Sequence, residues 1–89
     1  MEFRWNAWNL DHIGEHGVRR TEAQEVVETA APPYPDYRGD DRWLVWGRST
    51  SGRYLQVIFV LDPDGTTFVI HARPLTEREK RAFRRRRRQ

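Results

Sequence analysis

The sequence predicts one α+β domain in which an antiparallel β-meander packs on N-terminal helices and is followed by a C-terminal helix. Three runs rich in aromatic and β-branched residues, 42–50, 53–61 and 66–73, predict the strands of the meander. Two turn-forming sequences, Ser51-Gly52 and Asp62-Pro63-Asp64-Gly65, separate these runs. Because a chain of 89 residues rarely divides into independent units, we expect a single domain.

Capping residues predict two helices before the meander. Asn6 is a suitable N-cap for a helix over 7–16, because its side chain can accept hydrogen bonds from the first backbone N–H groups. Gly17 can end that helix. Thr21 is expected to cap a second helix, with Gln24 at the reciprocal position of a capping box.

The remaining segments are predicted from their proline and capping residues. A short first strand is expected over 3–5, and the prolines in 31–41 make that stretch a connecting segment. Thr76 is expected to cap the last helix, with Glu79 completing a capping box. We therefore expect Glu79 to be a capping residue rather than an acid catalyst.

The two turns suggest a register for the meander. If Thr50 pairs with Arg53 and Leu61 pairs with Thr66, alternate residues of the three strands share a face. The face expected to form the core is almost wholly apolar: Leu44, Trp46, Leu55, Val57, Phe59, Phe68, Ile70 and Ala72. The opposite face is expected to be polar at one end: Gly47, Ser49, Tyr54, Gln56, His71 and Arg73. Its other end is apolar: Trp43, Val45, Ile58, Val60 and Val69.

The polar end of this second face is a candidate site for cleaving RNA. His71 suits general acid or base catalysis, because a histidine ordinarily has a pKa of about 6.5. Arg73 and Arg48 are expected to bind phosphate oxygens, although this register places Arg48 at the rim of the apolar face. Tyr54 can orient the substrate or stack on an unpaired base, and Gly47 is expected to leave room for it. An ordinary polar, solvated face is the alternative interpretation.

Charge is distributed unevenly along the chain. Residues 1–72 hold seven Arg and eleven Asp or Glu, a net charge of −4, whereas residues 73–89 hold nine Lys or Arg and two Glu, a net charge of +7. This asymmetry predicts a polyanionic partner, with nucleic acid the first candidate. Residues 84–89 are interpreted as a frayed, solvated basic tail. Further RNA contacts are expected from Arg53, Gln56, Arg78, Lys80 and Arg81.

Several functional classes are disfavoured by composition. The absence of Cys excludes disulfides and thiolate metal sites, and it fits a reducing cytosol. No apolar run approaches the roughly 18 residues of a membrane span, so we expect a cytoplasmic protein with no membrane partner. His12 and His16 stand four apart, a spacing that can bind one metal ion, but no third ligand is apparent. We therefore expect no metal and no cofactor.

Short sequences in order along the chain resemble the BrnT-type toxin family. The first are Phe-Arg-Trp-Asn at 3–6, Trp-Asn-Leu-Asp-His-Ile-Gly-Glu-His-Gly-Val at 8–18 and Thr-Glu-Ala-Gln-Glu-Val-Val at 21–27. The later ones are Gly47-Arg48-Ser49, Gly52-Arg53-Tyr54-Leu55, Ile70-His71-Ala72-Arg73 and Thr76-x-x-Glu79-x-Arg81. Because these pieces span almost the whole chain, the resemblance implies a single BrnT-like toxin domain over residues 1–89.

The resemblance implies a RelE-like ribonuclease fold and a cytoplasmic toxin of a type II toxin–antitoxin system. It also implies a small ribbon-helix-helix antitoxin that binds DNA, so that the toxin contacts DNA only indirectly, through the complex that represses its own operon. A homodimer of the toxin within that complex is left open. Arg48, Arg73 and the start of the last helix are implied to belong to the active region. The family often has a Tyr late in the last helix, where this chain has Phe83.

Two functions remain in competition. The first is a metal-independent endoribonuclease that uses the 2′-hydroxyl of RNA as nucleophile. The second is a non-catalytic module that binds the antitoxin or RNA without cleaving it. Phe83 in place of Tyr favours the second, because a hydroxyl that could serve catalysis is missing there; Tyr54 or His71 would then have to replace it.

Overall fold

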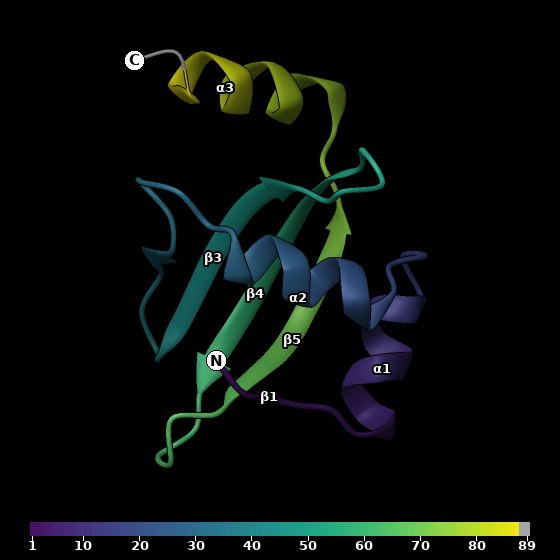
Figure 1. Ribbon diagram of the computed structural model, residues 1–89, viewed down its shortest axis with the longest axis vertical. Helices are drawn as coiled ribbons and strands as arrows, with labels where there is room; N and C mark the ends of the chain where they lie inside the picture. Colours follow the sequence, from purple (N-terminus) through teal and green to yellow (C-terminus); the bar gives the residue numbers. More distant parts are fainter. Residues whose placement is uncertain (88–89) are drawn as a thin grey trace.

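The computed structural model describes residues 1–87, so positions 88–89 of the predicted basic tail lie outside the described residues. The elements follow the order β1 (Phe3–Arg4), α1 (Ala7–Gly14), α2 (Arg20–Glu28), β2 (Asp36–Tyr37), β3 (Arg42–Arg48), β4 (Tyr54–Leu61), β5 (Thr67–Pro74) and α3 (Glu77–Arg87). Figure 1 shows α2 across one face of the sheet, α1 beside β5, and α3 across the end of the sheet. The predicted α+β class is confirmed.

The sheet is larger and more varied than predicted. Its strand order is β1-β5-β4-β3-β2, and the central β3-β4-β5 meander is antiparallel as expected. However, β1 pairs parallel to β5, so the sheet is mixed. A short strand, β2, also forms within the segment expected only to connect, and it pairs with β3. The predicted antiparallel meander is confirmed, but the sheet as a whole is not purely antiparallel, because its edge strand β1 is parallel to β5.

The helix caps were predicted with mixed success. Asn6 caps α1 through its side chain, and Asn9 completes the box by accepting from the Asn6 N–H at 2.8 Å. Thr21 is not a cap, because α2 already begins at Arg20. There the carboxylate of Glu22 accepts the Arg19 N–H at 3.2 Å, which satisfies a backbone donor that would otherwise lack a partner. The apolar stripe of α2 is buried: Ala23, Val26 and Val27.

The predicted register is wrong by one residue in both hairpins, and for the same reason. Ser49 rather than Thr50 pairs with Arg53 across the first turn, and Asp62 rather than Leu61 pairs with Thr66 across the second. Each loop has three residues and ends on a glycine with positive φ, Gly52 at 91° and Gly65 at 88°. A three-residue loop shifts the pairing of the two strands by one position relative to a loop of two or four residues. One such offset exchanges the two faces of the neighbouring strand.

A bulge in β5 returns His71, Ala72 and Arg73 to the faces of the sheet that were predicted for them. Phe59 pairs with Val69 and Ile58 pairs with His71, so Ile70 is the extra residue. The face under α2 carries Trp43, Val45, Gly47, Leu55, Val57, Phe59, Thr67, Val69 and Ala72. The other face, called the open face below, carries Leu44, Trp46, Arg48, Tyr54, Gln56, Ile58, Val60, Phe68, His71 and Arg73. Leu44, Trp46 and Phe68 were thus assigned to the wrong face.

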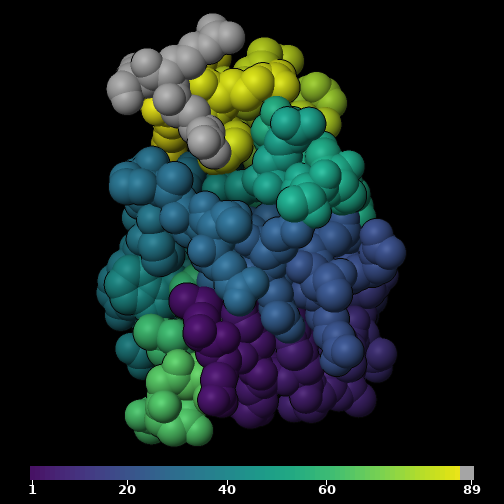
Figure 2. Space-filling model, viewed as in Figure 1, coloured from purple at the N-terminus to yellow at the C-terminus, as the bar shows by residue number. Residues whose placement is uncertain are grey.

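Gly47 serves a purpose opposite to the expected one. A Cβ atom at this position would lie 3.0 Å from Cγ1 of Val26, so the missing side chain makes room for α2, and the expected placement of Gly47 on the uncovered face is wrong. Ser49 is likewise buried on the α2 side, where its hydroxyl lies 2.7 Å from that of Ser51. Figure 2 shows the N-terminal segments and α2 covering this face, with α3 packed over the end of the molecule beside the β3–β4 turn.

No helix among the described residues is long and apolar enough to cross a membrane.

Candidate functional site

Tyr54 stands at the centre of a group of cations on the open face. The corrected register pairs Arg48 directly with Tyr54, and the Arg48 guanidinium carbon lies 5.5 Å from the centre of the Tyr54 ring. Two cations from α3 approach the same ring, Lys80 at 6.0 Å and Arg84 at 5.6 Å. These distances are within the range of cation–π attraction. We call this group, Arg48, Tyr54, Lys80 and Arg84, the Tyr54 platform.

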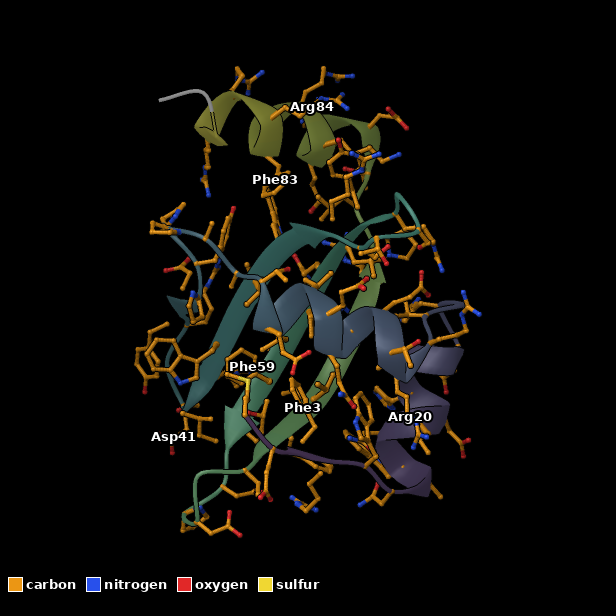
Figure 3. All side chains as sticks on the ribbon, in the orientation of Figure 1. Phe3, Arg20, Asp41, Phe59, Phe83 and Arg84 are labelled. Carbon is orange, nitrogen blue, oxygen red and sulfur yellow. The ribbon has the colours of Figure 1, made fainter. Side chains whose placement is uncertain are left out.

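Helix α3 is held in place by its apolar and capping contacts. Phe83 is buried and points from α3 toward the end of the sheet, where its ring lies 6.0 Å from that of Tyr54 and 6.2 Å from that of Tyr34 (Figure 3). The predicted capping box is confirmed: Glu79 accepts the Thr76 N–H at 2.8 Å, and the Thr76 hydroxyl accepts the Glu79 N–H at 3.1 Å. These contacts bring Lys80 and Arg84, one helical turn apart, over Tyr54.

The platform carries a net positive charge that the exposed carboxylate of Glu77 offsets only in part. Arg48 and Arg84 are exposed, and neither forms an ion pair with a carboxylate in the part of the chain that the structure describes. Lys80 pairs with Glu77 at 3.1 Å, but that carboxylate is itself 75% exposed, so water screens the pair. An aromatic ring next to unpaired guanidinium groups is suited to bind an anion that carries a flat base.

Arg73 belongs to a neighbouring network whose groups are already engaged. Its two terminal nitrogens donate to the two carboxylate oxygens of Glu79 at 2.7 and 2.8 Å. One of them also donates to Gln56 Oε1 at 3.2 Å, and this oxygen accepts the Trp46 indole N–H at 2.9 Å. The hydrogen bonds from Arg73 lower the pKa of Glu79 to about 2, and the carboxylate in turn raises the pKa of Arg73. In this arrangement Arg73 fixes the start of α3.

His71 lies on the open face but away from the platform. It pairs with Ile58 and not with the expected Gln56, and its ring lies 5.5 Å from that of His16. Burial lowers its pKa, and the charges of His16, Arg73 and His12 add to this effect. It is four strand positions from the level of Tyr54, which corresponds to about 13 Å. His71 and Arg73 share a face as predicted, but only Arg73, which pairs with Gln56, lies within two strand positions of Tyr54.

The other residues expected to contact RNA are divided among different surroundings. Arg53 is tied to Glu22 at 3.0 Å and to the Gly17 carbonyl at 2.9 Å, on the α2 side of the sheet, so it does not join the platform. Gln56 is buried and bonded as described, which gives it a positioning role. Arg78 and Arg81 are exposed on α3. Of the predicted RNA-binding residues, only Lys80 contacts the platform.

Sequence reasoning missed Arg84 because it was placed in the basic tail. Residues 84–87 form the last part of α3. Arg84 lies over Tyr54, and Arg86 lies over Trp46 at 5.7 Å while donating to the Tyr34 hydroxyl at 3.1 Å. The spacing of Lys80 and Arg84, four residues apart on a helix, was the signal available in the sequence.

His12 lies on α1, and His16 lies in the turn that follows this helix. His12 stacks on Trp8 with ring centres 4.5 Å apart, and His16 contacts His71. Within residues 1–87 no group of three or more His, Asp or Glu side chains is arranged to hold a metal ion.

An open groove of about 490 Å³ lies on the open face next to the platform. Its floor is formed by Leu44, Trp46 and Ile58, and Glu79 closes one end. Arg38 and Arg42 lie at its margin near β2.

Comparison with known proteins finds no match: no family model, no curated protein and no solved structure resembles this chain closely enough to be identified with it.

Proposed function

We propose that the protein is a metal-independent endoribonuclease toxin of a type II toxin–antitoxin system, and that RNA is cleaved at the Tyr54 platform. One observation carries the proposal: three cationic groups lie within 6.0 Å of a single phenol ring on the open face. Two of these cations, Arg48 and Arg84, have no carboxylate partner among the described residues. A phosphodiester of single-stranded RNA combines the two features that such a site binds, an anion and a base that can stack.

The chemistry follows from these groups. The 2′-oxygen attacks phosphorus and the bond to the 5′-oxygen breaks, which leaves a 2′,3′-cyclic phosphate and a 5′-hydroxyl. Arg48 and Arg84 bind the non-bridging oxygens and stabilise the extra negative charge of the phosphorane. The 2′-hydroxyl loses its proton to solvent, and the Lys80 ammonium supplies one to the leaving 5′-oxygen. Tyr54 orients the nucleotide by stacking on its base.

The resemblance to BrnT-type toxins supports the same location. It implies that Arg48, Arg73 and the start of the last helix belong to the active region. Arg48 and Lys80, from the first turns of α3, belong to the platform, whereas Arg73 lies in the neighbouring network with Glu79. We further propose the RelE-like classification of the fold, a cytoplasmic location, and neutralisation by a ribbon-helix-helix antitoxin. An acidic segment of that antitoxin would be attracted to the basic surface of α3.

A second candidate function is a module that binds RNA or antitoxin without cleaving it. Two observations favour it: the Arg73 guanidinium is held by Glu79, and His71 is four strand positions from the platform. In that case the platform would bind RNA but produce no cyclic phosphate.

The deciding experiment incubates purified protein with end-labelled single-stranded RNA in a metal chelator and analyses the fragment ends. We expect fragments with 2′,3′-cyclic phosphate, and a loss of rate on the order of a hundredfold for Arg48→Ala or Arg84→Ala. Arg20→Ala removes an equal charge from an exposed position on α2 and is expected to cleave normally. His71→Ala is expected to retain most of the rate.

The outcomes separate the two candidates. RNA that is bound by the wild type but never cleaved would support the non-catalytic module and refute the ribonuclease. Cleavage that survives Arg48→Ala and Arg84→Ala but is lost in His71→Ala would place the reaction at His71 and remove the platform from the mechanism.

A further inference from the structure

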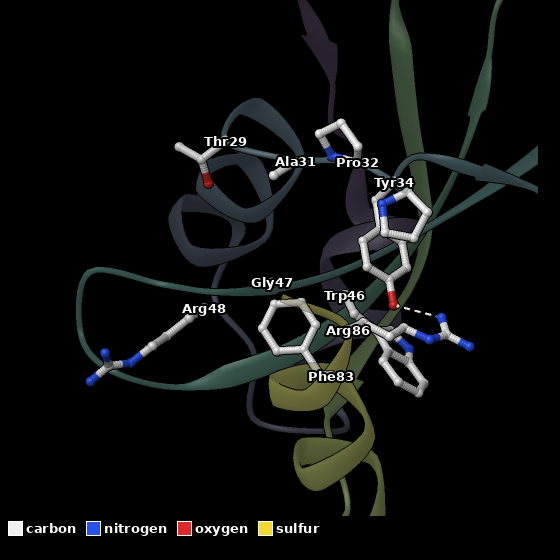
Figure 4. A pocket seen from close by; sticks show the side chains of 10 residues that line it. Thr29, Ala31, Pro32, Tyr34, Trp46, Gly47, Arg48, Phe83 and Arg86 are labelled. Carbon is white, nitrogen blue, oxygen red and sulfur yellow. Dashed lines mark hydrogen bonds between the residues drawn. The ribbon is translucent and has the colours of Figure 1, made fainter. Parts of the chain in front are cut away.

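We propose that a second, aromatic-walled cavity beside the platform binds one unpaired nucleobase, and so selects the nucleotide next to the cleaved bond. The cavity has a volume of about 220 Å³ and lies between segment 29–34, the end of β3 and α3 (Figure 4). This inference rests on the proposed action on RNA, which it deepens by naming what the protein recognises besides phosphate.

The walls of the cavity offer aromatic surface. Tyr34 and Phe83 are buried, with 7% and 3% of their surfaces exposed, and Trp46 is half-buried. The ring centre of Tyr34 is 6.2 Å from those of both Trp46 and Phe83. Tyr34 and Phe83 are held by the core, and Tyr34 also by the hydrogen bond from Arg86, so they fix the shape of the cavity, whereas Trp46 is the lining aromatic residue with the larger exposed fraction available for stacking. Purines and pyrimidines are the flat, unsaturated groups that such surfaces bind in nucleic acids.

The two charged residues of the cavity lie at its two ends. In Figure 4 the Arg48 side chain extends away from Tyr34, whereas Arg86 lies beside Tyr34 at the other end, with Phe83 between them. Within the described residues no carboxylate lines the cavity. A nucleotide within a strand has a phosphate on either side of its sugar, so cations at both ends of an aromatic cavity match it better than they match a neutral ring or a lone phosphate.

Arg48 connects the cavity with the platform. Its side chain lines the cavity and also lies over the Tyr54 ring. A base bound in the cavity would therefore place a neighbouring phosphate near Arg48, which is also part of the platform. This connection gives the cavity the position of a specificity subsite, in which the identity of one base decides which phosphodiester is presented for cleavage.

The test measures binding without cleavage. Short labelled oligodeoxynucleotides of each of the four bases lack the 2′-hydroxyl nucleophile, and a fully abasic strand keeps the same phosphates. For at least one base, we expect the wild type to bind tighter than it binds the abasic strand by roughly fivefold to a hundredfold. Ala31→Leu, which fills the cavity from an exposed lining position, and Phe83→Leu, which removes an aromatic wall, should each abolish that preference.

The controls distinguish this inference from the proposed function. Ala7→Leu makes the same change at an exposed alanine on α1 and should keep the base preference. Arg48→Ala should weaken binding of both the base-containing and the abasic strands. Equal affinity of the wild type for all strands, or a base preference that survives both Ala31→Leu and Phe83→Leu, would refute the base-binding cavity while the Arg48 effect still supported the platform. If Arg48→Ala instead bound both kinds of strand as tightly as the wild type does, the proposed function would be refuted.

Discussion

Two glutamates occupy the same local position in two helices, but they serve different parts of the molecule. Glu22 is the third residue of α2 and Glu79 is the third residue of α3. Each carboxylate accepts the backbone N–H of the residue before its helix, and each pairs with an arginine of the sheet region, Arg53 at 3.0 Å and Arg73 at 2.7 Å. The same capping device thus ties both helices to the sheet.

Their surroundings differ. The Glu22 side chain is 5% exposed, and it also accepts from the Ser51 hydroxyl at 3.1 Å, so it joins α2 to the β3–β4 turn within the covered side of the fold. The Glu79 pair lies on the open face, with 22% of the Glu79 side chain and 28% of the Arg73 side chain exposed. Glu22 therefore stabilises the core, whereas Glu79 positions α3 and restrains Arg73 next to the candidate site.

The largest effect is expected when the buried link is removed. Glu22→Ala should lower the free energy of unfolding by about 3 kcal/mol, because it deletes a cap and several hydrogen bonds to a buried carboxylate. Chemical denaturation with urea measures this change. Glu28→Ala removes an exposed carboxylate from the same helix and should cost far less. Equal losses in the two variants would show that Glu22 does not anchor α2.

Removing the exposed link should destabilise the protein less and change its binding. Glu79→Ala should lower the free energy of unfolding by about 1.5 kcal/mol, because the pair is partly solvated and only one capping interaction is lost. It should also release Arg73 to phosphate and raise the affinity for single-stranded nucleic acid severalfold. Asp11→Ala, an equal change of charge elsewhere, tests whether this gain is specific. A gain of the same size in both variants would contradict the release of Arg73.

The stability of the protein at acid pH should depend on the ion pair between Glu79 and Arg73. The pKa of Glu79 is held at about 2, below the usual value of 4.5, so its contribution is complete above about pH 4.5 and is lost as the pH falls toward 2. Glu79→Gln removes the titrating carboxylate. The variant should therefore lose about 1 kcal/mol less of its unfolding free energy on acidification than the wild type, after allowance for solvent screening. Denaturation curves between pH 5 and about 2 measure it. Superimposable pH profiles for the two proteins would argue against the pair.

The smallest effect is expected at His71, which lies on the open face four strand positions from the level of Tyr54. Because burial and neighbouring cations lower its pKa, the unfolded chain binds a proton more readily than the folded protein. His71 therefore favours the folded state fully above about pH 6.5, and this contribution is lost as the pH falls through the folded-state pKa. His71→Gln should flatten that dependence by about 0.5 kcal/mol or less. A proton NMR titration that gives His71 a pKa above 6.5 would contradict this environment.

The errors of sequence reasoning have a common physical origin. The glycines at Gly52 and Gly65 correctly marked both turns, but glycine is compatible with loops of two, three or four residues. The choice of a three-residue loop moved Arg48 beside Tyr54 and placed Gly47 under α2. The bulge at Ile70 has no local signal, yet it returned His71 and Arg73 to the open face. The sequence therefore identified some of the residues of the site, but it did not predict which of them lie next to one another.

The sequence by itself determined the α+β class, the central meander, the caps at Asn6 and Thr76, and the concentration of positive charge near the C-terminus. These features depend on local propensity, capping and composition, which act over a few residues. Only the tertiary structure decided the register, the parallel pairing of β1 with β5, and the meeting of Arg48 with Lys80 and Arg84 around one ring. Those arrangements depend on contacts between segments far apart in the chain, where a shift of one residue exchanges the faces of a strand.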